Sequence, residues 1–237
     1  MIDHIRRLRN IVAYASKIAR NEGQRKHLLP WLRSLRENYL LDEPSPWFSF
    51  DAIDYVRGFI ARGRAQAKTL RLFEYGSGGS TLFWQAHGIK CVSIEHDAQW
   101  FSSVHDRLDP TLVDHRLILP EPGGASRDAD PGDPRAYASG DPPSRGYSFR
   151  RYVEAIDEFP DSHFDIVVVD GRSRPSCLMH GAKKVRAGGL LIFDNAEVDY
   201  YMRNTWDFVR DFQHNEFWGV VPMNMWFSRT DVHVRNA

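Results

Sequence analysis

The chain has 237 residues, 42% of them hydrophobic, which is enough to bury the core of one domain with an appendage. Its 31 basic and 31 acidic side chains balance, so it lacks the overall positive field that draws proteins to nucleic acid. We therefore expect a small-molecule partner and no nucleic-acid partner.

The two cysteines, Cys91 and Cys177, lie far apart in the sequence and form no CxxC pair. The sequence thus predicts neither a disulfide framework nor a zinc knuckle, and a reducing, cytoplasmic setting is the simplest expectation. Charged residues interrupt the first ten positions, and no run reaches the roughly 18 apolar residues of a spanning helix. We expect no secretory leader and no transmembrane segment.

Apolar residues recur at helical spacing from residue 2 to residue 19, with arginines and a lysine between them, and predict an amphipathic basic helix. A second helix is expected over 28–41, before Pro44 and Pro46 break the pattern. We assign residues 1–45 to an N-terminal helical extension and 46–237 to the main domain. The apolar stripe is expected to pack on the main domain or on a second copy, which would give a homodimer through these helices. Attachment to an anionic membrane surface is the alternative.

After a helix expected over 50–61, short apolar strands alternate with helical segments, a pattern typical of a parallel sheet with helices on both faces. Ile166–Val169 and Leu190–Phe193 are apolar at consecutive positions, so their strands should be central. The predicted fold class is α/β. The strands are expected at 70–75, 91–95, 115–119, 165–170 and 190–194, with a closing pair at 217–221 and 225–228.

Residues 121–150 contain five prolines and five glycines, a composition that predicts a mobile loop over 121–146. Because this loop follows the third expected strand, it would hang over the carboxyl edge of the sheet, where ligands of open α/β folds bind. A lid over the substrate and a surface insertion both remain open as interpretations.

The first expected strand leads through Glu74 into a glycine-rich loop. Gly76 and Gly78 would let the chain turn sharply and bring its backbone against a ligand, and Glu74 could meet a ligand's ammonium group. Glu95 ends the second strand, nineteen residues after Gly76, where a carboxylate can accept hydrogen bonds from ribose hydroxyls. Together these features predict a nucleoside site. Thr81 stands where a dinucleotide fingerprint needs a third glycine, which disfavours pyrophosphate binding.

The segments Phe73–Thr81, Ser93–Asp97 and Val169–Arg172 resemble class I S-adenosylmethionine-dependent methyltransferases, and the likeness covers roughly residues 46–230. The resemblance implies a Rossmann-like, seven-stranded, mostly parallel sheet with an antiparallel C-terminal hairpin. It also implies that S-adenosylmethionine is the cofactor, with Glu95 holding the ribose and His96 near the adenine. The expected donor-site residues are Glu74, Tyr75, Gly76, Ser77, Gly78, Ser80, Glu95, His96 and Asp170.

Asp170, Asp194 and Asn195 end the fourth and fifth strands and should meet at the same edge as the donor loop. Hard divalent cations select such oxygen ligands. The arrangement is similar to catechol-type O-methyltransferases, which implies Mg²⁺ or another divalent cation on these three side chains. The residues after Asp170 depart from that pattern and look more like methyltransferases acting on sugar hydroxyls.

Without a metal, Asp170 would be the general base, and Arg172 would fix either an anionic group or the donor's carboxylate by a bidentate pair. Helix capping is the structural alternative for the three strand-end side chains. Aromatic side chains suit the wall of an acceptor pocket, and the candidates are Tyr147, Tyr152, Tyr200, Tyr201 and Trp206. The leading hypothesis is methylation of a hydroxyl on a small molecule or saccharide. A non-catalytic nucleoside-binding regulatory or scaffold domain is the alternative.

Overall fold

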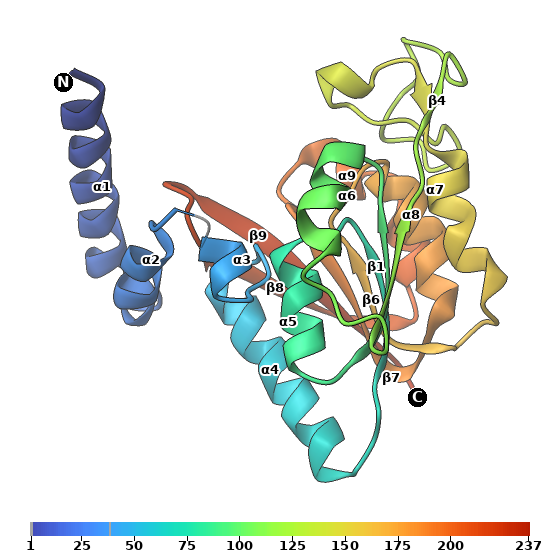
Figure 1. The fold of residues 1–237 in the computed structure, drawn as a ribbon, viewed down its shortest axis with the longest axis horizontal. Helices are drawn as coiled ribbons and strands as arrows, with labels where there is room; N and C mark the ends of the chain where they lie inside the picture. The colour runs from blue at the N-terminus through green and yellow to red at the C-terminus, as the bar shows by residue number, and fades with distance from the viewer. Residues whose placement is uncertain (1, 38) are drawn as a thin grey trace.

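The computed structural model describes residues 2–37 and 39–237, with side chains from residue 6 onward. A seven-stranded sheet runs through it in the order β3-β2-β1-β6-β7-β9-β8 (Figure 1). The first five of these strands pair in parallel, whereas β9 pairs antiparallel with both β7 and β8. This confirms the predicted α/β class and its C-terminal hairpin. The strands are β1 (Arg71–Tyr75), β2 (Lys90–Glu95), β3 (Val113–Leu117), β6 (Phe164–Val169), β7 (Val185–Asp194), β8 (Phe212–Val220) and β9 (Phe227–Arg235).

Helices cover both faces of the sheet. α4 and α5 bury one apolar cluster with every second strand residue, and α7 and α8 bury the other cluster with the alternate residues. Leu72 and Ile166 belong to the first cluster, while the neighbouring Phe73 and Val167 belong to the second. The helices are α1 (Ile2–Arg20), α2 (Leu28–Ser34), α3 (Tyr39–Asp42), α4 (Phe50–Ala65), α5 (Gly79–Ala86), α6 (Ala98–His105), α7 (Arg150–Glu154), α8 (Arg174–Gly181) and α9 (Asp199–Met202).

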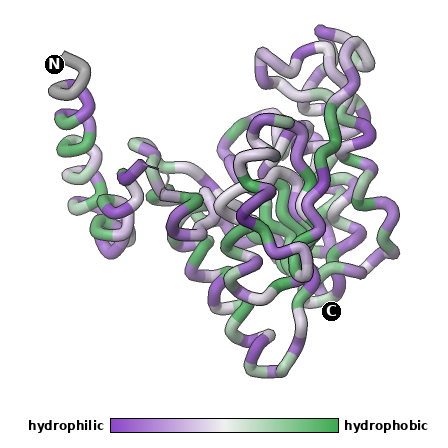
Figure 2. Tube along the Cα trace, in the orientation of Figure 1, coloured by the Kyte–Doolittle hydropathy of each residue, from purple (hydrophilic) through white to green (hydrophobic). Residues whose placement is uncertain are grey.

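The central position of β6 follows from its sequence. All six of its residues are buried, Asp165 included, because helices lie on both of its faces. Figure 2 shows the same result, since the middle of the sheet is hydrophobic while α1 alternates between hydrophilic and hydrophobic residues. The two strands expected to be central, β6 and β7, are neighbours in the sheet.

The N-terminal extension packs by its inner end on the β8–β9 hairpin. The predicted second helix is divided into α2 and α3. Tyr14 and Trp31 are buried with ring centroids 5.1 Å apart, and Trp31 Nε1 donates a 2.7 Å hydrogen bond to the carbonyl of Asn224 between the two strands. Farther out on α1, Leu8 and Val12 are 63% and 58% exposed. Pairing of two copies through this outer end stays a prediction. Every helix in the described ranges is too short or too polar to span a bilayer.

The segment expected to be a loop leaves the sheet after β3 and lies at its carboxyl edge (Figure 1). Its first residues form β4 (Glu121–Pro122), which pairs with β5 (Tyr147–Ser148). Asp130 forms an ion pair with Arg203 at 2.7 Å, just beyond α9, and the neighbouring Asn204 donates to the carbonyl of Gly132. These contacts fasten the segment beside α9. The mobility of 121–146 stays a prediction.

The closing hairpin is longer than the sequence predicts, since β8 and β9 have nine residues each. The missed part of β8 carries His214, Asn215 and Glu216 in succession. Such a polar run lacks strand alternation, but β8 is at the edge of the sheet, where one side is free to face solvent.

Candidate functional site

The glycine-rich loop lies at the end of β1, between the ends of its two neighbours. Gly76 donates its N–H to the carbonyl of Ile94 in β2. Its φ is +94°, a region that favours glycine, and a Cβ there would lie 3.0 Å from the carbonyl oxygen of Asp170. The loop thus approaches the end of β6 as closely as backbone atoms allow. Only glycine permits both the bend and the approach.

The Glu74 carboxylate lies beneath this loop and is fully buried. It accepts hydrogen bonds from Thr81 Oγ1 at 2.6 Å, and from Trp84 Nε1 and Ser93 Oγ at 2.9 Å each. Burial raises the pKa of Glu74 to about 7, although these donors act in the opposite direction. The sequence led us to expect this carboxylate at a ligand, but the structure buries it beneath the loop. Three donors inside the protein satisfy it instead, so it supports the loop from below.

Tyr75 also points inward. Its ring is fully buried, and its hydroxyl donates to the carbonyl of Val153 at 2.8 Å. Its side chain therefore belongs to the core against α7 rather than to a ligand site, because the alternation along β1 turns it away from the loop.

Glu95 ends β2 on the other side of the loop. One carboxylate oxygen accepts from the N–H and the hydroxyl of Ser77, both at 3.0 Å. The other accepts from the N–H groups of His96 and Asp97, and His96 Nδ1 lies 2.8 Å from it. Burial alone would raise the pKa of Glu95, but His96 and the backbone donors outweigh burial and lower the pKa to about 2. Glu95 is therefore an ionised acceptor.

A cavity of about 350 Å³ opens above these groups, which we call the donor cavity. Of the residues expected at a donor site, it brings together Gly76, Ser77, Ser80, Glu95, His96 and Asp170. Gly78 lies beside it, because a Cβ there would be 3.4 Å from the ring of Trp100. The full lining is Gly76, Ser77, Ser80, Glu95, His96, Asp97, Trp100, Asp170 and Arg172.

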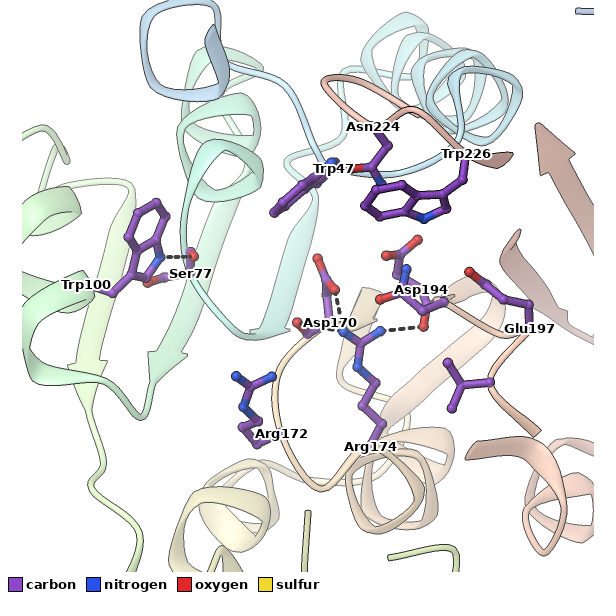
Figure 3. A pocket seen from close by; sticks show the side chains of 12 residues that line it. Trp47, Ser77, Trp100, Asp170, Arg172, Arg174, Asp194, Glu197, Asn224 and Trp226 are labelled. Carbon is purple, nitrogen blue, oxygen red and sulfur yellow. Dashed lines mark hydrogen bonds and ion pairs between the residues drawn. The ribbon is translucent and has the colours of Figure 1, made fainter. Parts of the chain in front are cut away.

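Asp170, which follows β6, and Asp194, which ends the adjacent β7, both contact the guanidinium of Arg174, a residue that the sequence analysis missed. Arg174 is 6% exposed, and its NH2 lies 3.0 Å from Asp170 Oδ1. It also donates to the carbonyl of Gly171 at 3.0 Å and to the carbonyl of Asp194. Figure 3 shows this side chain beneath the two carboxylates. Arg174 thus ties the two strand ends together.

Burial raises the pKa of both aspartates. For Asp170 the charges of Arg174 and Arg172 oppose this effect, whereas for Asp194 the neighbouring charge of Asp170 adds to it.

These side chains do not fit the magnesium site implied by the catechol-type resemblance. Asn195 turns its amide nitrogen to Ser228 Oγ at 3.1 Å. Asp194 Oδ1 accepts from Thr230 Oγ1 at 2.7 Å, and Asp170 already has the guanidinium of Arg174 as its counter-ion. A hard cation would have to displace these partners or lie beside a buried positive charge. We therefore assign no metal ion to these three side chains.

A second cavity of about 460 Å³ lies over the aspartates, which we call the acceptor cavity (Figure 3). Trp47 and Trp226 stand above Asp170 and Asp194, and Trp100 closes one side. Trp47 is held by a 2.8 Å hydrogen bond from Nε1 to the carbonyl of Pro222. The full lining is Trp47, Ser77, Trp100, Asp170, Arg172, Arg174, Asp194, Asn195, Glu197, Val198, Asn224 and Trp226.

The aromatic wall differs from the one expected. The five aromatic candidates named above do not line either cavity, and Tyr152, for example, is fully buried against Tyr75. The wall consists of tryptophans from the linker before α4, from α6 and from the β8–β9 turn. A sequence signal exists only for Trp100, which lies in the first turn of the helix that Asp97 caps. Trp47 and Trp226 reach the site only through tertiary packing.

Arg172 connects the site to the segment after β3. It lines both cavities, and its NH2 lies 3.4 Å from a carboxylate oxygen of Asp141. Both side chains are about one-third exposed, so this ion pair contributes little to the stability of the fold. It nevertheless places the segment 121–146 at the mouth of the site.

No protein-family model matches the chain, and a search of curated proteins gives no match. Among solved structures, a putative O-methyltransferase from Klebsiella pneumoniae superposes with a TM-score of 0.54 at 15% identity, over 87% of this chain and 90% of that one. The fold is that of class I methyltransferases. An O-methyltransferase from Bacillus cereus, solved in complex with SAH, gives a TM-score of 0.53 at 14% identity over the same shares of the two chains. At these identities the likeness shows only the fold, and the function depends on the residues of the site itself.

Proposed function

We propose that the chain transfers a methyl group from S-adenosylmethionine to a hydroxyl group of a small molecule or saccharide. The observation that carries this proposal is that the donor and acceptor cavities adjoin and share Ser77, Trp100, Asp170 and Arg172. A transfer between two bound molecules needs such a common boundary, because the reacting atoms must be held close together.

The residues of the donor cavity fit the nucleoside. Glu95 is ionised and lines the cavity, where ribose hydroxyls can replace Ser77 among its hydrogen-bond donors, and His96 lies next to it for the adenine side. Gly76 has no side chain, so the backbone of the loop can approach the ligand closely there. When bound, the donor supplies an electrophilic methyl group on a sulfonium.

The acceptor cavity supplies the base and the binding surface. Arg174 favours the ionised form of Asp170, which can therefore take the proton of an acceptor hydroxyl as that oxygen attacks the methyl carbon. Trp47 and Trp226 offer flat faces to a sugar or aromatic ring, and Arg172 can hold an anionic substituent.

Calorimetry with S-adenosylmethionine and S-adenosylhomocysteine tests the donor half. Both should bind the wild-type chain, and Glu95→Ala should weaken them about 10- to 100-fold, the usual worth of hydrogen bonds to a charged group. Glu121→Ala changes an exposed carboxylate in β4 and serves as the matched control. No heat of binding with the wild-type chain overturns the proposal.

Radiolabelled S-adenosylmethionine with a panel of phenols and saccharides tests the transfer itself. Label should pass to an acceptor, and Asp170→Asn should slow the transfer even when S-adenosylmethionine is saturating. Donor binding without transfer to any acceptor, together with no measurable effect of Asp170→Asn or Asp194→Asn, would favour the nucleoside-binding scaffold instead.

A further inference from the structure

Three side chains with metal-binding chemistry gather on the C-terminal hairpin, and none of them lines either cavity. They are His214 on β8 and Asp231 and His233 on β9, with one ligand atom from each lying within 4.8 Å of the others. His214 is the register partner of His233, and Asp231 precedes His233 by two residues. All three side chains therefore project from the same face of the hairpin. The neighbouring Thr230 points to the other face, where it bonds Asp194.

His233 is the least satisfied member of this cluster. It is fully buried, and neither of its ring nitrogens has a hydrogen-bond partner among the residues that the structure describes. Buried polar groups are rarely left unpaired, so such a group points to a missing partner.

The charges around the cluster also favour a cation. Asp231 is fully buried, and Arg229 contacts both of its oxygens. One oxygen lies 3.0 Å from Arg229 Nε, and the other accepts from Arg229 NH2 at 3.1 Å and lies 2.9 Å from His214 Nε2. Arg229 is shared with a second carboxylate, because its NH1 lies 3.2 Å from Glu216. Two carboxylates thus face one guanidinium, which leaves a negative charge next to two imidazoles.

The cluster is enclosed but reachable. The ring of Trp206 lies 5.3 Å from that of His214 and 6.3 Å from that of His233, centroid to centroid. The side chain of His214 is 31% exposed and gives an ion a way in from solvent.

We propose that His214, Asp231 and His233 bind one divalent transition-metal ion and that Zn²⁺ suits them best. Two imidazole nitrogens and one carboxylate oxygen are a common three-ligand set for zinc, with a fourth position left for water. Arg229 holds Asp231 from the outer side and orients it. The ion joins β8 to β9 across the sheet edge.

Cobalt titration of the untagged chain tests this site, because tetrahedral Co²⁺ absorbs visible light and Zn²⁺ displaces it. One equivalent of Co²⁺ should bind and be displaced by one equivalent of Zn²⁺, and Zn²⁺ should raise the Tm. His214→Ala and His233→Leu should each weaken binding more than about 100-fold, since losing a ligand costs more than losing an outer partner. His115→Ala removes one of the two histidines, His105 and His115, that lie together near β3, and should change nothing.

His233→Leu should fold without metal, because leucine replaces an unpaired polar group with an apolar one. If His233→Leu does not fold, Co²⁺ uptake by His214→Ala tests the site instead, because that position is partly exposed. The proposal is overturned if the folded wild-type chain takes up no Co²⁺, or if uptake survives in His214→Ala. If Co²⁺ binding is lost in His115→Ala or Asp170→Asn but kept in His214→Ala, the ion binds elsewhere and the proposal is also overturned.

Discussion

Glu74 and Glu95 end neighbouring strands, yet their surroundings move the pKa of the two carboxyl groups in opposite directions. Glu74 lies fully inside the protein with three neutral donors, and its pKa rises to about 7. Glu95 accepts four hydrogen bonds, three of them from backbone N–H groups, lies beside His96, and its pKa falls to about 2. The first carboxyl group can therefore keep its proton near neutral pH, while the second is ionised at any physiological pH.

The stability of the protein should depend on the charge of Glu74. Between about pH 4.5 and 7 the folded chain keeps a proton on Glu74 that the unfolded chain releases, so the free energy of unfolding should fall as the pH rises through this window. The shift corresponds to about 3 kcal/mol. Glu74→Gln should remove this part of the decrease, as measured by urea unfolding at several pH values. Glu121→Gln is the control. The prediction is contradicted if the free energy of unfolding falls with pH equally steeply in both variants.

Removing Arg174 should leave the Asp170 carboxylate buried without its counter-ion. We expect Arg174→Ala to lower the free energy of unfolding by about 3–5 kcal/mol, the usual cost of breaking a buried ion pair from one side. Arg172→Ala, at a side chain that is 36% exposed, should cost less than about 1 kcal/mol. Chemical denaturation measures both variants. Similar losses for the two would show that burial of the Asp170–Arg174 pair is not what matters.

The sequence could predict those site residues whose place follows from their own strand or turn. Ser77, Glu95 and Asp170 are of this kind, because each comes directly at the end of a strand whose apolar pattern is clear. Arg174 could not be found this way, since its partners are carbonyls of Gly171 and of Asp194, the latter twenty residues away in the sequence. From the sequence alone, an arginine shortly after a strand is expected to be exposed. Its burial depends on the packing of both strands.

At the scale of elements, the start of α5 carries the contact between the donor loop and the N-terminal extension. A Cβ at Gly79 would lie 2.5 Å from the carbonyl oxygen of Leu40 and 2.6 Å from that of Ser45. No side chain fits there unless the chain between α3 and α4 moves away. The extension therefore packs directly on the helix that ends the donor loop.

Gly79→Ala should displace this segment and destabilise the protein by about 1–3 kcal/mol, as overpacking does elsewhere. Gly58→Ala is the matched control, because that helical glycine in α4 has no atom closer than 3.6 Å to an added Cβ. The control should stabilise by about 0.5–1 kcal/mol. Thermal unfolding compares the two, and limited proteolysis should cut residues 35–48 faster in Gly79→Ala only. Stabilisation by both substitutions would refute the close contact.

The strands differ in how far the sequence could predict them. Ile166–Val169 in β6 and Leu190–Phe193 in β7 are apolar at consecutive positions because both strands are buried on both faces. The position of β6 was therefore predicted to within one residue, whereas β7 begins at Val185, five residues before its predicted start. The first half of β8 could not be predicted, since an edge strand with polar residues has no distinctive period. The division of the expected second helix also depends on packing, because α2 ends where Ser34 bonds the hairpin turn at Met223.

At the scale of the whole molecule, order should decrease from the centre of the sheet to its periphery. Hydrogen exchange should be slowest in β1 and β6 and fastest in the outer half of α1 and in residues 121–146, whose backbone bonds are mostly isolated turns. Binding of S-adenosylhomocysteine should slow exchange in 76–80 and 95–97. Protection of 121–146 equal to that of β6 would contradict the predicted mobility of this segment.

Two indole N–H groups from the first fifty residues hold carbonyl groups of the turn between β8 and β9, Trp31 at Asn224 and Trp47 at Pro222. The two ends of the chain thus build one wall of the acceptor cavity, while the donor cavity is made by the middle of the chain. If the proposed function holds, mutations near both termini should change which acceptor binds, while the residues that bind the donor stay unchanged.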